Sequence, residues 1–188
     1  MAVNVRAGSK GKGRIRSLSR KGSQSGKILP VTAQAGATPE PSVCERCGAV
    51  FSRRTWRRDR KVTDALFAKA KWTVCPSCRQ VAGGEYFGRV VLRGTYVVPN
   101  ETVIRQRIEN VAARAGFTQP ERRLVSVSRA GDELEVLTTS QKLAHRLVRE
   151  LTKAFRGKAS YAWSSDDGAL YATWERNVAS STPARPRR

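Results

Sequence analysis

Residues 44–78 have the sequence CERCGAVFSRRTWRRDRKVTDALFAKAKWTVCPSC, and this stretch holds all four cysteines of the 188-residue chain. The cysteines form two C-x-x-C pairs, and two residues between thiolates let one tight turn present both sulfurs to a single metal ion. Two such turns, or knuckles, complete a tetrahedral ligand set. Gly48, directly after the first pair, permits the positive φ angle that such turns often require. The spacing predicts a zinc ribbon with an insertion, in which one structural zinc ion is held by Cys44, Cys47, Cys75 and Cys78.

Other uses of these cysteines fit the sequence less well. Disulfides are uncommon in a basic chain without a secretion signal, and a thioredoxin-like redox pair belongs in a βαβ context. Four cysteine ligands leave no open coordination position, so we expect the metal to be structural. A zinc deaminase requires a His-x-Glu pair ahead of its C-x-x-C, and the single histidine, His145, follows both pairs. We expect His145 to be a surface residue and the chain to have no enzymatic activity.

The charge of the chain points to a polyanionic partner. Lys and Arg number 36 against 15 Asp and Glu, for a formal net charge of +21. Such a surface repels itself unless a polyanion neutralises it, and nucleic acid is the commonest partner because binding releases counterions from phosphates. No stretch approaches the roughly 20 apolar residues of a membrane span. The composition predicts a cytoplasmic nucleic-acid-binding protein with no membrane contact and no small-molecule substrate.

The excess of positive charge is densest at the N-terminus and around the cysteines. Six of the ten residues from Ser52 to Lys61 are basic. An arginine guanidinium forms a planar fork onto phosphate, and both Arg and Trp stack on bases. Trp56 fits base stacking and packing in a small core equally well, whereas packing is favoured for Phe51 and Trp72. The candidate RNA-binding residues of this insertion are Arg53, Arg54, Trp56, Arg57, Arg58, Arg60 and Lys61.

Two tails flank the ordered regions. Residues 1–42 are rich in Gly, Ser, Lys and Arg, which predicts disorder because so few apolar groups cannot offset the ordering entropy. An organellar transit peptide has a similar acid-poor composition, but this segment is Gly-rich and lacks an amphipathic apolar face. Residues 179–188 form a second basic tail. The N-terminal residues expected to contact RNA are Lys10, Lys12, Arg14, Arg16, Arg20 and Lys21.

After the ribbon, predicted to cover residues 43–84, a second region at 85–178 alternates strand and helix patterns. Strands are predicted at 86–93, 124–128 and 133–138, and a terminal hairpin at 158–164 and 169–175. Helices are expected after the N-caps Asn100 and Ser140. The order strand, helix, strand, strand, helix, strand, with one extra strand, predicts a ferredoxin-like (split β-α-β) domain. The whole chain is therefore expected to be α+β, with both helices on one face of an antiparallel sheet.

The aromatic residues of the terminal hairpin have two interpretations. Tyr161, Trp163, Tyr171 and Trp174 alternate along its two strands. In the first, the aromatic side chains on one face of the hairpin stack on bases at the open face of the sheet, as in RNA-recognition folds. In the second, the aromatic side chains pack in the core and across strands. The RNP1 pattern of RNA-recognition folds is absent, so packing is favoured.

The pattern Cys44-x-x-Cys47-x-x-x-Phe51, followed by Trp56 and a second C-x-x-C, resembles the zinc-binding N-terminal region of a known family. This is the archaeal and eukaryotic family of nuclear export adaptors of the large ribosomal subunit, and short bacterial proteins share the layout. A mixed α/β region follows in that family too, and Val90-Val91-Leu92-Arg93-Gly94 looks similar. The resemblance covers residues 43–178 in layout and about a dozen residues in detail.

The chain also departs from that family. It has one set of two cysteine pairs where longer members have more, and it lacks their later domains and export signals, so nuclear export is not expected. The resemblance implies binding to the large ribosomal subunit or its RNA, with the zinc module at the RNA. We therefore expect a non-enzymatic RNA-binding protein that acts in ribosome assembly, hibernation or quality control, with rRNA and ribosomal proteins as partners.

Two other function classes remain open. A zinc-ribbon DNA-binding regulator has the same charge signature, although the sequence contains no evident dimer element or recognition helix. A protein-interaction adaptor would bind acidic partners through the ribbon, and its binding would survive nuclease treatment.

Overall fold

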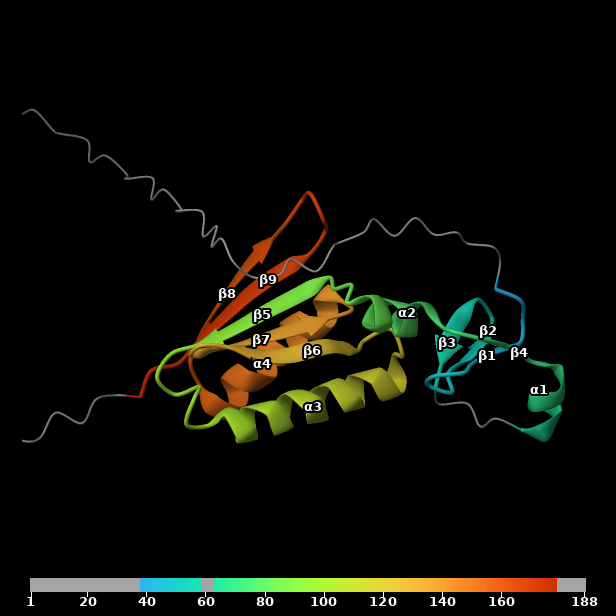
Figure 1. Cartoon of the computed structure of the whole chain (residues 1–188), viewed down its shortest axis with the longest axis horizontal. Helices are drawn as coiled ribbons and strands as arrows, with labels where there is room; N and C mark the ends of the chain where they lie inside the picture. The colour runs from blue at the N-terminus through green and yellow to red at the C-terminus, as the bar shows by residue number, and fades with distance from the viewer. Residues whose placement is uncertain (1–37, 59–62, 179–188) are drawn as a thin grey trace, which may run out of the picture.

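In the computed structural model of the chain, the described residues are 38–58 and 63–178. A small four-stranded sheet with two short helices precedes a five-stranded sheet with two longer helices (Figure 1). The expected α+β class is thus confirmed. Within the described ranges, no helix has the length and apolar character needed to cross a membrane.

The first sheet has the order β3-β2-β1-β4. Its strands are β1 (Ser42–Cys44), β2 (Val50–Ser52), β3 (Thr55–Arg57) and β4 (Lys71–Thr73). β1 pairs antiparallel with β2 and parallel with β4, which brings the chain segments before the two C-x-x-C pairs side by side. The sheet therefore places both cysteine pairs at the same end of two neighbouring strands.

Two short helices accompany this sheet. α1 (Asp64–Lys69) begins at Thr63, whose Oγ1 accepts a hydrogen bond from the backbone N–H of Leu66. α2 (Pro76–Gly83) begins at Cys75, with Pro76 at the first helical position, where its missing N–H is not needed. Gly84 ends α2 with φ +69, a left-handed conformation that favours glycine.

The second sheet has the order β6-β7-β5-β9-β8. Its strands are β5 (Gly88–Arg93), β6 (Leu124–Ala130), β7 (Glu133–Thr138), β8 (Lys158–Trp163) and β9 (Leu170–Glu175). Its helices are α3 (Glu101–Thr118) and α4 (Gln141–Phe155). The predicted strand-helix-strand-strand-helix-strand order, with one extra strand, is confirmed.

The terminal hairpin differs from the expected antiparallel arrangement. β9 lies next to β5 and runs parallel to it, while β8 pairs only with β9 at the edge. Burial explains why β9, and not β8, lies next to β5. β9 buries Leu170, Ala172 and Trp174, whereas all six residues of β8 are exposed. The more apolar strand of the hairpin takes the inner position.

The core lies between the sheet and the two helices α3 and α4, which cover one face (Figure 1). Leu143, Leu147 and Leu151 of α4 are fully buried, as the apolar stripe predicted. Ser140 caps α4 through its Oγ, which accepts from the backbone N–H of Leu143. Asn100 also precedes a helix, but its side chain donates to the carbonyl of Tyr96 and makes no capping bond.

The opposite face of the sheet carries paired charges. Arg89 Nε lies 2.6 Å from Glu135 Oε1, and Arg93 Nη2 lies 2.9 Å from Glu175 Oε2. Both pairs join neighbouring strands on the face away from the helices. Because these two arginines have carboxylate partners, they offer little uncompensated charge to a polyanion.

Candidate metal centre and basic hairpin

The four cysteine sulfurs converge on one point. All four Sγ atoms lie within 4.8 Å of one another, and the Cys44–Cys78 and Cys47–Cys75 sulfur pairs are each 3.8 Å apart. A tetrahedron with Zn–S bonds of about 2.3 Å has edges of about 3.8 Å. The cysteines are free thiols, since a disulfide would bring two sulfurs to about 2.05 Å. The predicted metal-binding cluster is confirmed in its geometry.

The two cysteine pairs are positioned differently. Cys44 ends β1, and the turn after it is closed by the Gly48 N–H, which donates to the Cys44 carbonyl over 2.9 Å. Gly48 has φ +67, as the sequence predicted. The second pair is not the expected knuckle: Cys75 is the N-cap residue of α2 and Cys78 lies in its first turn. The free N–H groups at a helix N-terminus carry partial positive charge, which opposes the effect of burial on these two thiols.

Burial and hydrogen bonding act on the thiols in opposite directions. Burial raises the pKa of Cys44, but backbone N–H groups of Cys75, Cys47 and Arg46 outweigh it and lower the pKa to about 7. Burial holds the pKa of Cys75 and of Cys78 above the usual thiol value. Burial thus favours the protonated form of the Cys75 and Cys78 thiols. A divalent metal ion that binds the cluster displaces these protons.

Two of the sulfurs accept hydrogen bonds from N–H donors. The backbone N–H of Cys75 donates to Cys44 Sγ over 3.3 Å, and Arg123 Nη1 donates to Cys78 Sγ over 3.0 Å. Such donors offset the negative charge that four thiolates place around a divalent cation. Arg123 lies 45 residues after Cys78, so no local sequence pattern indicated this contact.

A small apolar core packs around the cysteines. Trp56 is half-buried against the cluster, near the fully buried Ala49, and its ring centroid lies 5.2 Å from that of Phe51. Of the two interpretations of Trp56, the structure therefore favours packing, and the half-buried Phe51 agrees with its expected role. Trp72 differs from expectation, because it is 49 % exposed on the edge strand β4.

The cations of the insertion gather on one hairpin. We call residues 50–58 the basic hairpin; its β2–β3 turn contains Arg53 and Arg54, with φ angles of 52° and 59°. Both turn N–H groups donate to the carboxylate of Glu40, over 3.0 and 2.7 Å. The side chains of Arg53, Arg54, Arg57 and Arg58 are exposed. None of these four arginines forms an ion pair with a residue that the structure describes.

The remaining candidate RNA-binding residues lie outside the described ranges 38–58 and 63–178. They are Lys10, Lys12, Arg14, Arg16, Arg20, Lys21, Arg60 and Lys61.

The aromatics of the β8–β9 hairpin divide into two groups. Trp174 is fully buried and donates its Nε1–H to the carbonyl of Arg156 over 2.9 Å, and Tyr171 is half-buried with its hydroxyl bound to Asp167. Both agree with the expected packing. Trp163 is 62 % exposed, so the expectation is wrong there. The cause is the edge position of β8, which leaves Trp163 outside the core between the sheet and the two helices.

A comparison with models of protein families found no matching family, and a comparison with curated proteins found no similar sequence.

Proposed function

We propose that the protein is a non-enzymatic RNA-binding protein whose basic hairpin contacts the RNA backbone. The observation that supports this most directly is a group of four exposed arginines on a hairpin that begins next to the cysteine cluster. β2 starts two residues after Gly48, and Ala49 accepts a hydrogen bond from the Cys44 N–H over 2.8 Å. The base of the hairpin is thus tied to the cysteines while its turn extends into solvent.

One zinc ion, held by Cys44, Cys47, Cys75 and Cys78, completes this proposal. Zinc prefers tetrahedral thiolate sets, and the four sulfurs match its dimensions. With four cysteine ligands no position remains for water or substrate, so the ion acts as a structural crosslink between the β1–β2 turn and the start of α2. It holds the basic hairpin in place and reduces the entropy lost when the hairpin binds RNA.

The charges of the basic hairpin favour phosphate as its ligand. Each arginine presents a planar set of N–H donors that matches phosphate oxygens. Because these arginines lack carboxylate partners among the described residues, no ion pair within residues 38–58 and 63–178 has to break before they bind. The resemblance of the cysteine pattern to the large-subunit export adaptors supports rRNA of the large subunit, with ribosomal proteins nearby, as the partner.

The proposal is tested by fluorescence anisotropy of labelled RNA at several salt concentrations. Two variants remove charge from the basic hairpin: Arg57→Ala with Arg58→Ala, and Arg53→Asn with Arg54→Gly. The second pair keeps residues that accept positive φ angles in a tight turn, so the hairpin shape is retained. For single strands, each lost phosphate contact reduces the slope of log K against log salt concentration by about 0.7. We expect each double variant to bind more weakly with a flatter salt dependence.

A matched control removes the same charge elsewhere. Arg114→Ala with Lys158→Ala changes two exposed residues, neither of which forms an ion pair with a described residue. If this control weakens binding as much as the hairpin variants, the interaction depends on total charge and the basic hairpin is not the contact.

The ribosomal partner is tested separately by sucrose-gradient sedimentation of the tagged protein, with and without RNase. Co-migration with the large subunit at moderate salt, lost after RNase, is the expected result. Binding to duplex DNA that exceeds RNA binding, or capture of a partner that survives nuclease, would replace the RNA proposal by the regulator or the adaptor.

A further inference from the structure

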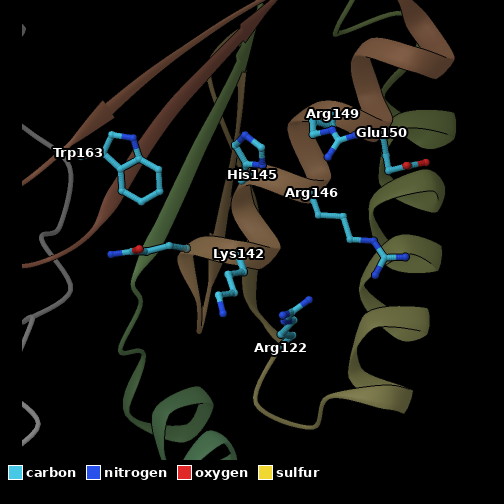
Figure 2. Close-up of a pocket in the computed structure, with 8 residues that line it drawn as sticks. Arg122, Lys142, His145, Arg146, Arg149, Glu150 and Trp163 are labelled. Atoms are coloured by element: carbon cyan, nitrogen blue, oxygen red, sulfur yellow. The ribbon is translucent and has the colours of Figure 1, made fainter.

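A groove of about 540 Å³ lies between α4 and β8 (Figure 2). We call it the α4–β8 groove; it is lined by Arg122, by α4 residues between Gln141 and Glu150, and by Trp163 of β8. Its volume falls within the range of about 300–1,000 Å³ that ligand-binding pockets occupy. Figure 2 shows Trp163 on the side of α4 that carries His145 and Lys142.

The groove is strongly cationic, and of its four basic residues only Arg122 forms an ion pair within the described ranges, with Glu121 over 3.8 Å. Lys142, Arg146 and Arg149 are exposed, and none forms an ion pair with a residue in the described ranges. The single carboxylate of the lining, Glu150, is already bound to Arg107 over 2.7 Å and to Lys153 over 3.5 Å. A solvated helix face usually interleaves acids with bases, so this lining leaves positive charge for an external anion.

An aromatic platform stands beside these cations. Trp163 is 62 % exposed, and its indole makes no ring contact or side-chain hydrogen bond with a described residue. Next to it on β8, Tyr161 packs its ring 5.0 Å from that of His145 and joins the strand to α4. An exposed indole face is suited to stacking on a nucleobase.

The spacing of the cations suits consecutive phosphates. Lys142, Arg146 and Arg149 follow one another at four and three residues along α4. Residues at this spacing share a helix face, with Cβ atoms about 5–6 Å apart. A single strand can therefore place neighbouring phosphates along α4 while one base turns toward β8.

We propose that the α4–β8 groove binds a short single-stranded segment of RNA, with a base stacked on Trp163 and phosphates at Lys142, Arg146 and Arg149. This rests on the proposed function for the identity of the polyanion, but it uses residues outside the basic hairpin. A base within a duplex has both faces covered by its neighbours, so the groove selects single strands.

The test measures the full chain, loaded with zinc, against a labelled single-stranded oligonucleotide and the matching RNA duplex. Trp163→Ala removes the platform and Trp163→Tyr retains an aromatic face. Loss of one stacked base corresponds to about 5- to 160-fold weaker single-strand binding. We expect that loss for Trp163→Ala, near-normal binding for Trp163→Tyr, and little change of duplex affinity for either. Arg146→Glu should weaken single-strand binding more than Arg114→Glu, which makes the same charge change on α3.

The outcomes separate this inference from the proposed function. If the basic-hairpin variants lose RNA and the groove variants bind as the unaltered chain does, the inference fails and the proposed function stands. If only the groove variants lose RNA, the inference stands and the basic hairpin is not the contact. Equal loss of single-strand and duplex binding in Trp163→Ala overturns the inference, and so does a Trp163→Tyr variant as weak as Trp163→Ala. A chain that binds no RNA overturns both.

Discussion

Arg123 Nη1 lies 3.0 Å from Cys78 Sγ, so a residue directly before β6 donates a hydrogen bond to the cysteine cluster. The backbone of Arg123 is itself fixed, because its N–H donates to Thr139 Oγ1 and its carbonyl accepts from the Thr139 N–H, each over 2.9 Å. The metal centre is thereby connected to the larger sheet through one side chain. We expect the two parts of the chain to influence each other's stability through this bond.

Replacing Arg123 tests that connection. Loss of a group that donates a hydrogen bond to a metal ligand typically lowers metal affinity by about 10- to 100-fold. We expect Arg123→Ala to lose zinc to a chromophoric chelator at a correspondingly lower chelator concentration, and Arg123→Lys to retain part of the affinity. Arg114→Ala, which removes an exposed arginine from α3, is the control. An Arg123→Ala protein with unaltered affinity would show that the bond contributes nothing to metal retention.

Metal binding should release protons, and its strength should rise with pH. Burial keeps the pKa of the Cys75 and Cys78 thiols above the usual value, so both hold protons at neutral pH until the metal displaces them. Acid restores the thiols and weakens binding, because protons and metal compete for the same sulfurs. We expect release of about two protons or more per zinc at pH 8. Calorimetry in buffers of different ionisation enthalpy measures this number, and a value near zero would contradict it.

Glu40 should restrain the basic hairpin. Its carboxylate binds the N–H groups of Arg53 and Arg54, which places one negative charge where phosphates are proposed to bind. Glu40→Gln removes the charge and keeps a carbonyl acceptor for the turn. We expect several-fold tighter RNA binding at low salt, with the difference reduced at high salt by screening. Weaker binding would mean that the carboxylate supports the hairpin geometry more than it competes with RNA.

Two tryptophans of the β8–β9 hairpin should differ sharply in their effect on stability. Trp174 is fully buried, so Trp174→Ala should lower the free energy of unfolding by about 3–5 kcal/mol. Trp163 is mostly exposed, so Trp163→Ala should change it by about 0.5 kcal/mol or less. Urea unfolding monitored by circular dichroism measures both. A large loss in Trp163→Ala would show a structural role for that side chain.

Much of the fold follows from short-range patterns in the sequence. The stripe Leu143, Leu147 and Leu151 and the cap Ser140 mark α4 because helical periodicity and capping depend on residues three or four positions apart. The two C-x-x-C pairs likewise predict a common cluster, since four thiols at this spacing have a shared ligand as their main use. These features involve neighbours in the chain, and local chemistry is enough to recognise them.

The site was predictable only in part. Arg53, Arg54, Arg57 and Arg58 stand out by composition and lie together on the basic hairpin. The partnership of Glu40 with the hairpin turn was not predictable, because it depends on how the segment before β1 passes the turn. The role of Trp56 was not predictable either. Its neighbours in sequence are cationic, but in the folded chain it packs against the cysteines.

Local patterns thus determined α3, α4, the strands of the larger sheet, the cysteine cluster and the excess of positive charge. Tertiary packing decided which strand of the terminal hairpin lies inside the sheet, and therefore that Trp174 is buried and Trp163 exposed. It also brought Arg123 to Cys78 and placed Trp163 across from the cations of α4. The physical reason is that segments far apart in the sequence compete for places in one core, and this competition decides which strands pair and which side chains are buried. The spacing of residues along the chain does not predict its outcome.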